Sequence, residues 1–430
     1  MTTAGDRLAA ALARVVDVRA DEIRALLLSF AYFFCLLCGY YIIRPLREEM
    51  GIAGGVENLP WLFTGTFVAM LVAVPLFGAT VARFAKRRIV PLVYRFFIAN
   101  ILIFFVLLRF DIGAEHVARA FFIWTSVYNL FVVSVFWSFM ADVFRNDQAR
   151  RLFGFIAAGG SAGALLGPTL TAALAVPLGP VALLLISALF LEAAVQCIRR
   201  LSVALPARGE ARDKAPDDAP IGGGIFAGIT LVLRSRYLLG ICLYILIFTT
   251  TSTFLYFQQA HIVAAAFDDP AERTRLFALI DLSVGVLTLL VQCFATGRLI
   301  AWLGVGPTLA VLPLLTVVGF VGLAMAPTLV VLVAFQSIRR AANFAIAKPS
   351  REVLYTVLDA ERKYKAKNVI DTLVYRGGDA VSGWAYAGLS AIGLGLPAIA
   401  LAAVPLAGVW LATGLRLGRA QDRMAARTGT

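Results

Sequence analysis

Apolar segments of about 20 residues recur along the whole of this 430-residue chain, and a helix of that length crosses the hydrocarbon layer of a membrane. The chain is 60% hydrophobic and 15% charged, with a mean hydropathy of +0.84, which is too apolar for a soluble domain. Ten-residue segments of alternating polarity, typical of outer-membrane barrels, are missing from the sequence. We predict an all-α membrane protein with twelve transmembrane helices, at residues 25–43, 61–81, 90–108, 120–140, 152–173, 179–198, 237–258, 276–297, 303–325, 328–346, 369–391 and 397–415.

The positions of Lys and Arg predict the orientation, because cytoplasmic loops retain these residues. Assigning alternate loops to the inside places 29 of the 39 basic residues there, against 6 outside and 4 within spans. We therefore expect both termini to be cytoplasmic, as an N-terminal segment 1–24 and a tail 416–430. Segment 1–24 has no cleavage site, so we do not expect a signal peptide. The protein is expected in a bacterial inner membrane.

One long polar segment divides the chain. Residues 199–236 contain prolines, a run of charges and three consecutive glycines, and are predicted to be a cytoplasmic linker. Six spans precede it (25–198) and six follow it (237–415), which is the two-bundle plan of major facilitator transporters. The sequence therefore predicts two six-helix bundles.

Small residues repeat every fourth position in span 152–173, at Gly159, Gly163 and Gly167. Such a stripe lets a neighbouring backbone approach closely. Two interpretations stay open: a seam along which bundles rock, or static packing between helices.

Charges within apolar spans usually face a water-filled cavity, because burying them in lipid costs roughly 2.5–3.5 kcal/mol. In span 328–346, Gln336, Arg339, Arg340 and Asn343 follow an i, i+3, i+4, i+7 spacing and share one helical face. We interpret them as substrate-binding residues. The alternatives are a structural ion pair with a neighbouring helix, or a side chain that extends to the membrane surface.

Span 369–391 adds Arg376 as a substrate-binding candidate and two buried acids, Asp371 and Asp379. Asp281 is a third acid, in span 276–297. Such carboxylates either pair with the arginines or carry a coupling proton, and the sequence does not choose between these roles.

The end of the first span carries Tyr40, Arg44 and Arg47 on one face, which predicts an aromatic surface beside two guanidinium groups that match phosphate or carboxylate oxygens. Anchoring at the membrane surface is the alternative for this group. Asn129, in span 120–140, is a further substrate-binding candidate, although one amide can also bridge two helices.

Other chemistries lack their residues. No phosphate-binding loop for ATP hydrolysis occurs, and His116 and His261 lack metal-ligand spacing. Cys35 and Cys38 lie within lipid without partner ligands, which favours helix packing over a metal site. Since most of the net charge of +13 lies on the predicted cytoplasmic face, it does not indicate nucleic-acid binding. We expect no metal, no cofactor and no enzyme activity.

Four runs of sequence, at residues 40–52, 136–144, 148–160 and 350–379, together resemble the nucleotide transporter (ADP,ATP carrier) family of plastids and intracellular bacteria. The sharpest part is KAKNVID, preceded by Tyr364. The resemblance implies a twelve-helix exchanger of nucleotides whose basic residues hold phosphates, and it assigns that role to Arg44, Arg47, Lys365 and Lys367. Better-known members carry an acidic residue in the middle of the fourth helix, whereas residues 123–129 contain none. We therefore expect a divergent member.

These observations predict a secondary transporter that moves a nucleotide or a related organic anion by alternating access. Its partners are expected to be a small anionic solute and the lipid bilayer, and the protein is expected to be a monomer. The alternatives are a proton-coupled transporter of a siderophore, drug or organic acid, and a membrane assembly partner that does not transport.

Overall fold

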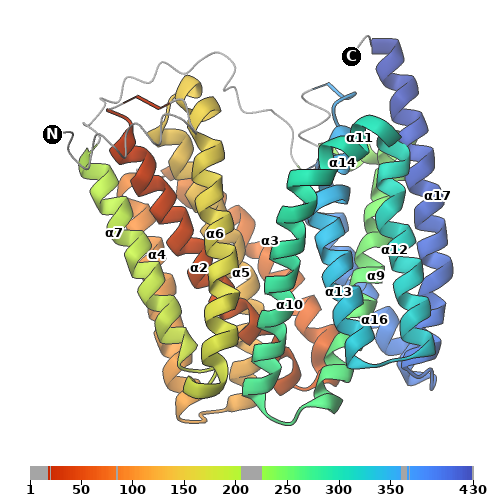
Figure 1. The fold of residues 1–430 in the computed structure, drawn as a ribbon, viewed down its shortest axis with the longest axis horizontal. Helices are drawn as coiled ribbons and strands as arrows, with labels where there is room; N and C mark the ends of the chain where they lie inside the picture. Colours follow the sequence, from red (N-terminus) through yellow and green to blue (C-terminus); the bar gives the residue numbers. More distant parts are fainter. Residues whose placement is uncertain are drawn as a thin grey trace. The chain divides into compact units, whose positions relative to one another are not determined.

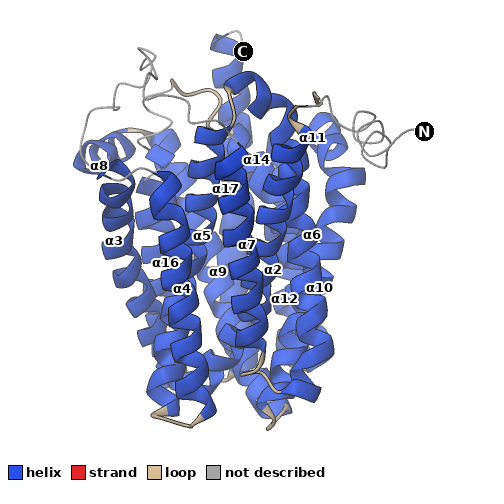
Figure 2. Cartoon of the chain, turned by 90° about the vertical axis from the view of Figure 1, so that its left-hand side faces the viewer, coloured by secondary structure: helices blue, strands red, loops and turns tan. Residues whose placement is uncertain are grey.

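A computed structural model describes residues 18–19, 21–83, 86–204, 225–359, 366–367 and 369–428 of the chain. Helices account for the regular structure throughout these residues (Figure 2), which confirms the all-helical prediction. The first half of the chain contains η1 (Val56–Asn58) and six long helices: α2 (Ile23–Ala53), α3 (Leu59–Arg83), α4 (Lys86–Arg109), α5 (Ala114–Val143), α6 (Asn146–Leu178) and α7 (Leu183–Ala204).

The second half begins with a short helix and continues with long helices, three of which are interrupted by π-helical turns. Its elements are α8 (Ile225–Arg234), α9 (Arg236–Ala266), α10 (Pro270–Val291), η3 (Gln292–Thr296), α11 (Gly297–Leu303), α12 (Val305–Met325), α13 (Leu329–Ala342), η4 (Asn343–Ala347), α14 (Lys348–Val353), η5 (Ile370–Val374), α16 (Tyr375–Ala391) and α17 (Leu396–Thr428). Figure 1 shows their course in colour along the chain.

Ten of the described helices are long and apolar enough to cross a membrane. The two other long segments, α7 and the helix formed by η5 and α16, each contain three charged residues. Many helices run beyond the predicted spans; α2, for example, continues past Arg44 and Pro45 to Ala53. Hydropathy detects only the lipid-facing length of a helix, so it stops short of polar ends.

The three π-helical turns η3, η4 and η5 each insert an extra residue into a helix. Such turns free backbone groups and occur frequently at functional sites. The Thr296 hydroxyl donates to the carbonyl of Val291, five residues earlier, at 3.2 Å, and to the carbonyl of Ala345 in η4 at 2.8 Å. A side chain thus joins two of these turns.

Contacts between Cα atoms divide the chain into two compact units. Unit 1 comprises Met1–Gly54, Val68–Asp213 and Asp269–Leu282, and unit 2 comprises Gly55–Phe67, Lys214–Asp268 and Ser283–Thr430. Each unit has its own hydrophobic core: Tyr32, Phe136 and Phe139 lie in that of unit 1, and Tyr244 and Trp410 in that of unit 2. The domain boundaries predicted from the sequence, at residues 198 and 237, stay a prediction.

The glycine stripe of α6 packs against α2, and the two helices run side by side in unit 1 (Figure 1). A Cβ added at Gly159 would lie 2.6 Å from the Phe30 carbonyl oxygen, and one at Gly167 would lie 2.8 Å from the Cys38 carbonyl oxygen. Only hydrogen atoms fit at these positions. The stripe therefore serves static helix packing inside one unit.

A buried carboxylate fixes the start of α2 to the start of α6. Glu22, whose side chain is 4% exposed, accepts a hydrogen bond from Gln148 at 2.8 Å and pairs with Arg151 at 3.1 Å. The backbone N–H of Arg19 donates to the same carboxylate. Burial raises the pKa of Glu22, but these hydrogen bonds and the Arg151 charge outweigh burial and hold the pKa below its usual value.

We expect Gly163→Ala to lower the free energy of unfolding by about 1–3 kcal/mol, because its Cβ would overlap the Phe34 carbonyl oxygen and push α2 from α6. Thermal unfolding in detergent measures the effect. Gly154→Ala on the same helix is the matched control, since a Cβ there meets nothing within 4 Å. Equal melting temperatures for both variants would contradict this account of the stripe.

We expect part of the stability of unit 1 to be lost in acid through Glu22. Because its folded pKa is lowered, its contribution is complete above the ordinary value of 4.5 and disappears as the pH falls through the folded pKa. Melting temperatures of the wild type and of Glu22→Gln, measured between about pH 6 and pH 3.5, should therefore converge as the pH falls. A constant difference across this range would contradict the assignment.

Candidate functional site

A pocket of about 430 Å³ lies within unit 2 and falls in the range of small-molecule sites. Its walls come from α9, η4, α14, η5, α16 and the residues that precede η5. The lining residues are Phe248, Asn343, Phe344, Lys348, Arg351, Glu352, Lys367, Asp371, Tyr375 and Arg376. Four of these side chains are basic and two are acidic, so the pocket carries a formal excess of positive charge.

Local structure explains why these side chains meet. Lys348, Arg351 and Glu352 follow an i, i+3, i+4 spacing on the short helix α14, which places them on one face. The chain after α14 is held by the Tyr237 hydroxyl of α9, which donates to the Leu354 carbonyl at 2.8 Å. Two π-helical turns supply further wall residues, Asn343 from η4 and Asp371 from η5.

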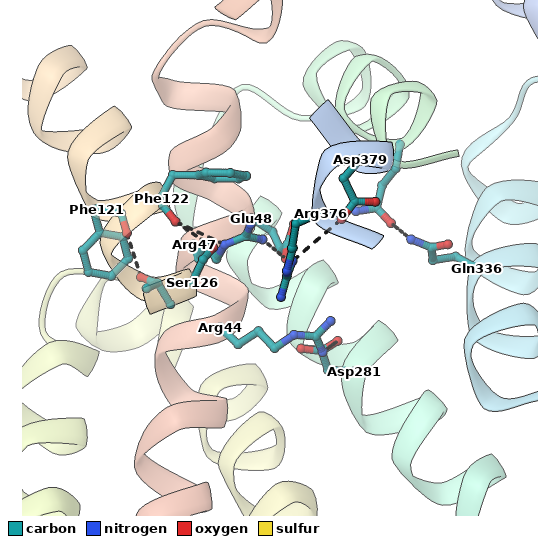
Figure 3. Close-up of polar contacts among 12 residues, drawn as sticks. Arg44, Arg47, Glu48, Phe121, Phe122, Ser126, Asp281, Gln336, Arg376 and Asp379 are labelled. Carbon is teal, nitrogen blue, oxygen red and sulfur yellow. Dashed lines mark hydrogen bonds and ion pairs between the residues drawn. The ribbon is translucent and has the colours of Figure 1, made fainter. Parts of the chain in front are cut away.

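Two of the four cations are already paired with carboxylates. Lys367 Nζ lies 2.6 Å from the Glu352 carboxylate, and both side chains are partly exposed. Arg376 lies 3.7 Å from Asp379 (Figure 3). The Asp379 carboxylate also accepts a hydrogen bond of 3.4 Å from the Thr253 hydroxyl. Both ion pairs are partly exposed and therefore weak, since such pairs contribute only about 0–1 kcal/mol. Either cation can thus exchange its carboxylate partner for an anion of a ligand.

Arg339 of α13 is buried, with 3% of the residue exposed, and does not line the pocket. Its guanidinium group donates to the hydroxyls of Thr316 at 3.2 Å, Thr251 at 3.0 Å and Ser252 at 2.9 Å. It also lies 5.4 Å from the ring centroid of Phe248, a pocket residue. Arg339 therefore lies in a second layer, next to the pocket wall.

The rest of the predicted stripe on α13 separates along the helix. Gln336 donates to Gln259 of α9 at 2.8 Å in a buried amide pair, and Arg340 is half-buried. Asn343 lies in the π-helical turn and reaches the pocket. The residues predicted to share one face thus have different roles: Gln336 and Arg339 form hydrogen bonds in the interior, whereas Asn343 lines the pocket.

In unit 1, Arg44 of α2 extends toward Asp281 of α10 and pairs with it at 2.6 Å (Figure 3). The Asp281 side chain is 3% exposed and that of Arg44 is 21% exposed. One turn further along α2, Glu49 is fully buried and pairs with Arg273 of α10 at 2.8 Å. The two ion pairs join the C-terminal part of α2 to α10.

The other candidates of unit 1 surround this region. Arg47 pairs with Glu48 at 3.0 Å, donates to the Phe122 carbonyl of α5 at 3.3 Å and lies 3.8 Å from the Phe122 ring centroid. The Tyr40 ring is 6.2 Å from that of Tyr128, also on α5. Asn129 is half-buried on α5 beside Tyr128 in sequence. Arg47 and Tyr40 therefore both contact α5.

Of the residues predicted from the sequence, the pocket brings together Asn343, Lys367, Asp371 and Arg376. Lys365 lies outside the described residues. The sequence-based prediction of binding residues did not include Phe248, Lys348, Arg351, Glu352 or Tyr375. The i, i+3, i+4 spacing at residues 348–352 is the available signal, but the distribution of basic residues assigns this segment to a cytoplasmic loop.

The chain belongs to the major facilitator superfamily, whose family model matches residues 25–347. Solved structures with the same fold include the nucleoside transporter NupG (13% identity, TM-score 0.59) and a bacterial homologue of the iron transporter ferroportin in an inward-facing state (13%, 0.66). A third is an auto-inhibited POT family peptide transporter (13%, 0.63). These alignments cover 94%, 92% and 93% of this chain and 98%, 98% and 97% of the other chains, respectively. A search of curated protein sequences finds no match.

As a member of this superfamily, the protein is a multi-pass membrane transporter that works by alternating access, and not an enzyme. It moves a small molecule across a lipid bilayer, as the sequence predicted. Because the identity to the solved structures is only 13%, they show the fold alone. The substrate has to be inferred from the chemistry of the site.

The buried pair between Arg44 and Asp281 generates a stability prediction. We expect Asp281→Asn to destabilise the protein by roughly 3 kcal/mol, because it leaves a largely buried guanidinium group without its counter-ion. Thermal unfolding of the two single variants and of Arg44→Gln/Asp281→Asn gives a double-mutant cycle. The double variant should be more stable than Asp281→Asn alone. If the loss of stability in the double variant equals the sum of the losses in the two single variants, a direct ion pair is contradicted.

Proposed function

We propose that the transported substrate is a nucleotide or a closely related organic anion, and that it binds in the pocket of unit 2. The observation that carries the proposal is the set of four basic residues around one small-molecule-sized pocket, at Lys348, Arg351, Lys367 and Arg376. Guanidinium forks match phosphate and carboxylate oxygens, and ammonium groups add charge without fixed direction. Supporting this, the resemblance to nucleotide carriers independently gives a phosphate-binding role to Lys367.

The aromatic lining favours a substrate with an aromatic ring. Phe248 and Tyr375 both line the pocket, with ring centroids 5.9 Å apart. A ring that stacks on such side chains gains about 1–3 kcal/mol in nucleic-acid-binding proteins. Together with the basic residues, this composition suits a phosphorylated nucleoside better than a purely aliphatic acid.

A proton-coupled transporter of an organic acid is the second candidate. Asp371 lies in the pocket wall among basic residues, where a carboxylate can take up and release a proton during the cycle. This candidate uses the same cations but predicts that a pH gradient drives flux.

We further propose that the protein acts as a monomer in a bacterial inner membrane.

Transport by purified protein in liposomes tests the proposal. We expect uptake of labelled ADP or ATP that depends on unlabelled nucleotide inside the vesicles. An aliphatic organic acid serves as the competing substrate, and an imposed pH gradient serves as the competing driving force. Uptake of the acid alone, driven by the gradient, would favour the second candidate. Absence of uptake for every anion, with or without internal substrate, would contradict both.

Variants of the pocket test the site itself. We expect Arg351→Gln and Arg376→Gln each to raise the KM for nucleotide by about ten-fold or more, because each removes a charge-assisted hydrogen bond worth roughly 1.5–3 kcal/mol. Arg95→Gln is the matched control, since Arg95 is a half-exposed arginine on α4 that pairs with Glu192. Equal effects of all three substitutions would contradict the assignment of the pocket.

A further inference from the structure

The guanidinium group of Arg339 is held by three hydrogen bonds but is not neutralised. Its three hydrogen-bond acceptors, Thr316, Thr251 and Ser252, come from α12 and α9 and are all hydroxyls. Within the part of the chain that the structure describes, no carboxylate pairs with Arg339. The hydroxyls satisfy its donors while leaving a full positive charge inside unit 2.

An uncompensated charge of this kind costs folding free energy, because ionisable groups in a membrane interior are expensive even when hydrogen-bonded. A neutral side chain could donate to the same hydroxyls at lower cost. Helix packing alone therefore does not explain an arginine at this position. Its charge must act on something nearby.

The nearest functional feature is the pocket wall. Arg339 lies 5.4 Å from the Phe248 ring, and Phe248 in turn contacts Tyr375. Both aromatic residues line the pocket, whereas Arg339 does not. The positive charge is thus separated from a bound ligand by an apolar ring rather than by water, and water would screen it.

We propose that Arg339 is a specificity-determining residue that acts through space: its buried charge, fixed behind the aromatic wall, makes the pocket prefer ligands with more negative charges. This inference rests on the proposed function, since it concerns how the same pocket discriminates among anions. Two unit charges about 10 Å apart at an effective dielectric constant of about 20 change a binding constant roughly ten-fold. The effect therefore scales with the charge of the ligand, which hydrogen bonding or packing would not do.

Adenosine, AMP and ADP form a suitable ligand series, because the first is neutral and each added phosphate adds negative charge at pH 7.5. We expect Arg339→Gln to weaken AMP binding by about 30- to 100-fold, because the phosphate of AMP carries nearly two negative charges, and to weaken ADP binding by a larger factor. Adenosine binding should change by less than about two-fold. Arg339→Lys should retain most of the discrimination. Arg95→Gln again controls for the loss of one arginine. Equilibrium binding in detergent provides the readout.

A second pair of variants keeps Arg339 in place, in case its replacement prevents folding. Ser252→Asp introduces a carboxylate beside the guanidinium group and should neutralise it, whereas Ser252→Asn has the same shape without the charge. We expect Ser252→Asp to weaken ADP more than AMP and to spare adenosine. Ser252→Asn should keep the charge dependence of the wild type.

The outcomes separate the two proposals. If Arg339→Gln or Ser252→Asp weakens adenosine, AMP and ADP by the same factor, the role of Arg339 is structural and the inference is overturned while the proposed function stands. Binding that is unchanged for all three ligands overturns it equally. If the wild-type protein binds none of the three, the nucleotide part of the proposed function fails and the inference fails with it.

Discussion

Lipid as a solvent makes each interior charge costly, and the arrangement of polar residues in this protein follows from that constraint. The structure meets the cost in three ways. Arg44 and Glu49 of α2 pair with opposite charges on α10. Arg339 is surrounded by hydroxyls. The basic residues of the pocket stay at least partly exposed. The last arrangement gathers four basic side chains around one pocket, which is why the pocket is the proposed site of recognition.

The backbone follows the same constraint. In an apolar medium every N–H and C=O group needs an internal partner, which helices provide. The π-helical turns η4 and η5 depart from regular helix where Asn343 and Asp371 enter the pocket wall. Irregular backbone at membrane depth is tolerated where it lines a water-filled cavity. The π-helical turns therefore lie beside the polar pocket because backbone groups that leave the regular helix need polar surroundings.

Hydropathy predicted the helices because the signal is local: about 20 apolar residues are sufficient to indicate a span. The stripe of polar residues on α13 was equally visible. The interaction partners of the buried arginines could not be predicted from the sequence. Arg44 and Asp281 are 237 residues apart in sequence, and no local spacing connects them. Arg339 depends on hydroxyls such as those of Thr251 and Thr316, and threonine is an ordinary residue inside an apolar helix.

Lys348 and Arg351 were not predicted for a different reason. Basic residues at the end of a span usually indicate orientation. In the structure, the helix continues through η4 into α14 and brings both residues to the pocket.

The pairing of Lys367 with Glu352 gives the proposed site a physical basis for exchange. Glu352 neutralises Lys367 at 2.6 Å, so the pocket does not present four free cations. In the proposed function, an incoming phosphate or carboxylate would replace Glu352 as the partner of Lys367, at a small net cost because this ion pair is partly exposed. A substrate with several negative charges can in addition engage Lys348 and Arg351, which explains why such a pocket would favour multiply charged anions.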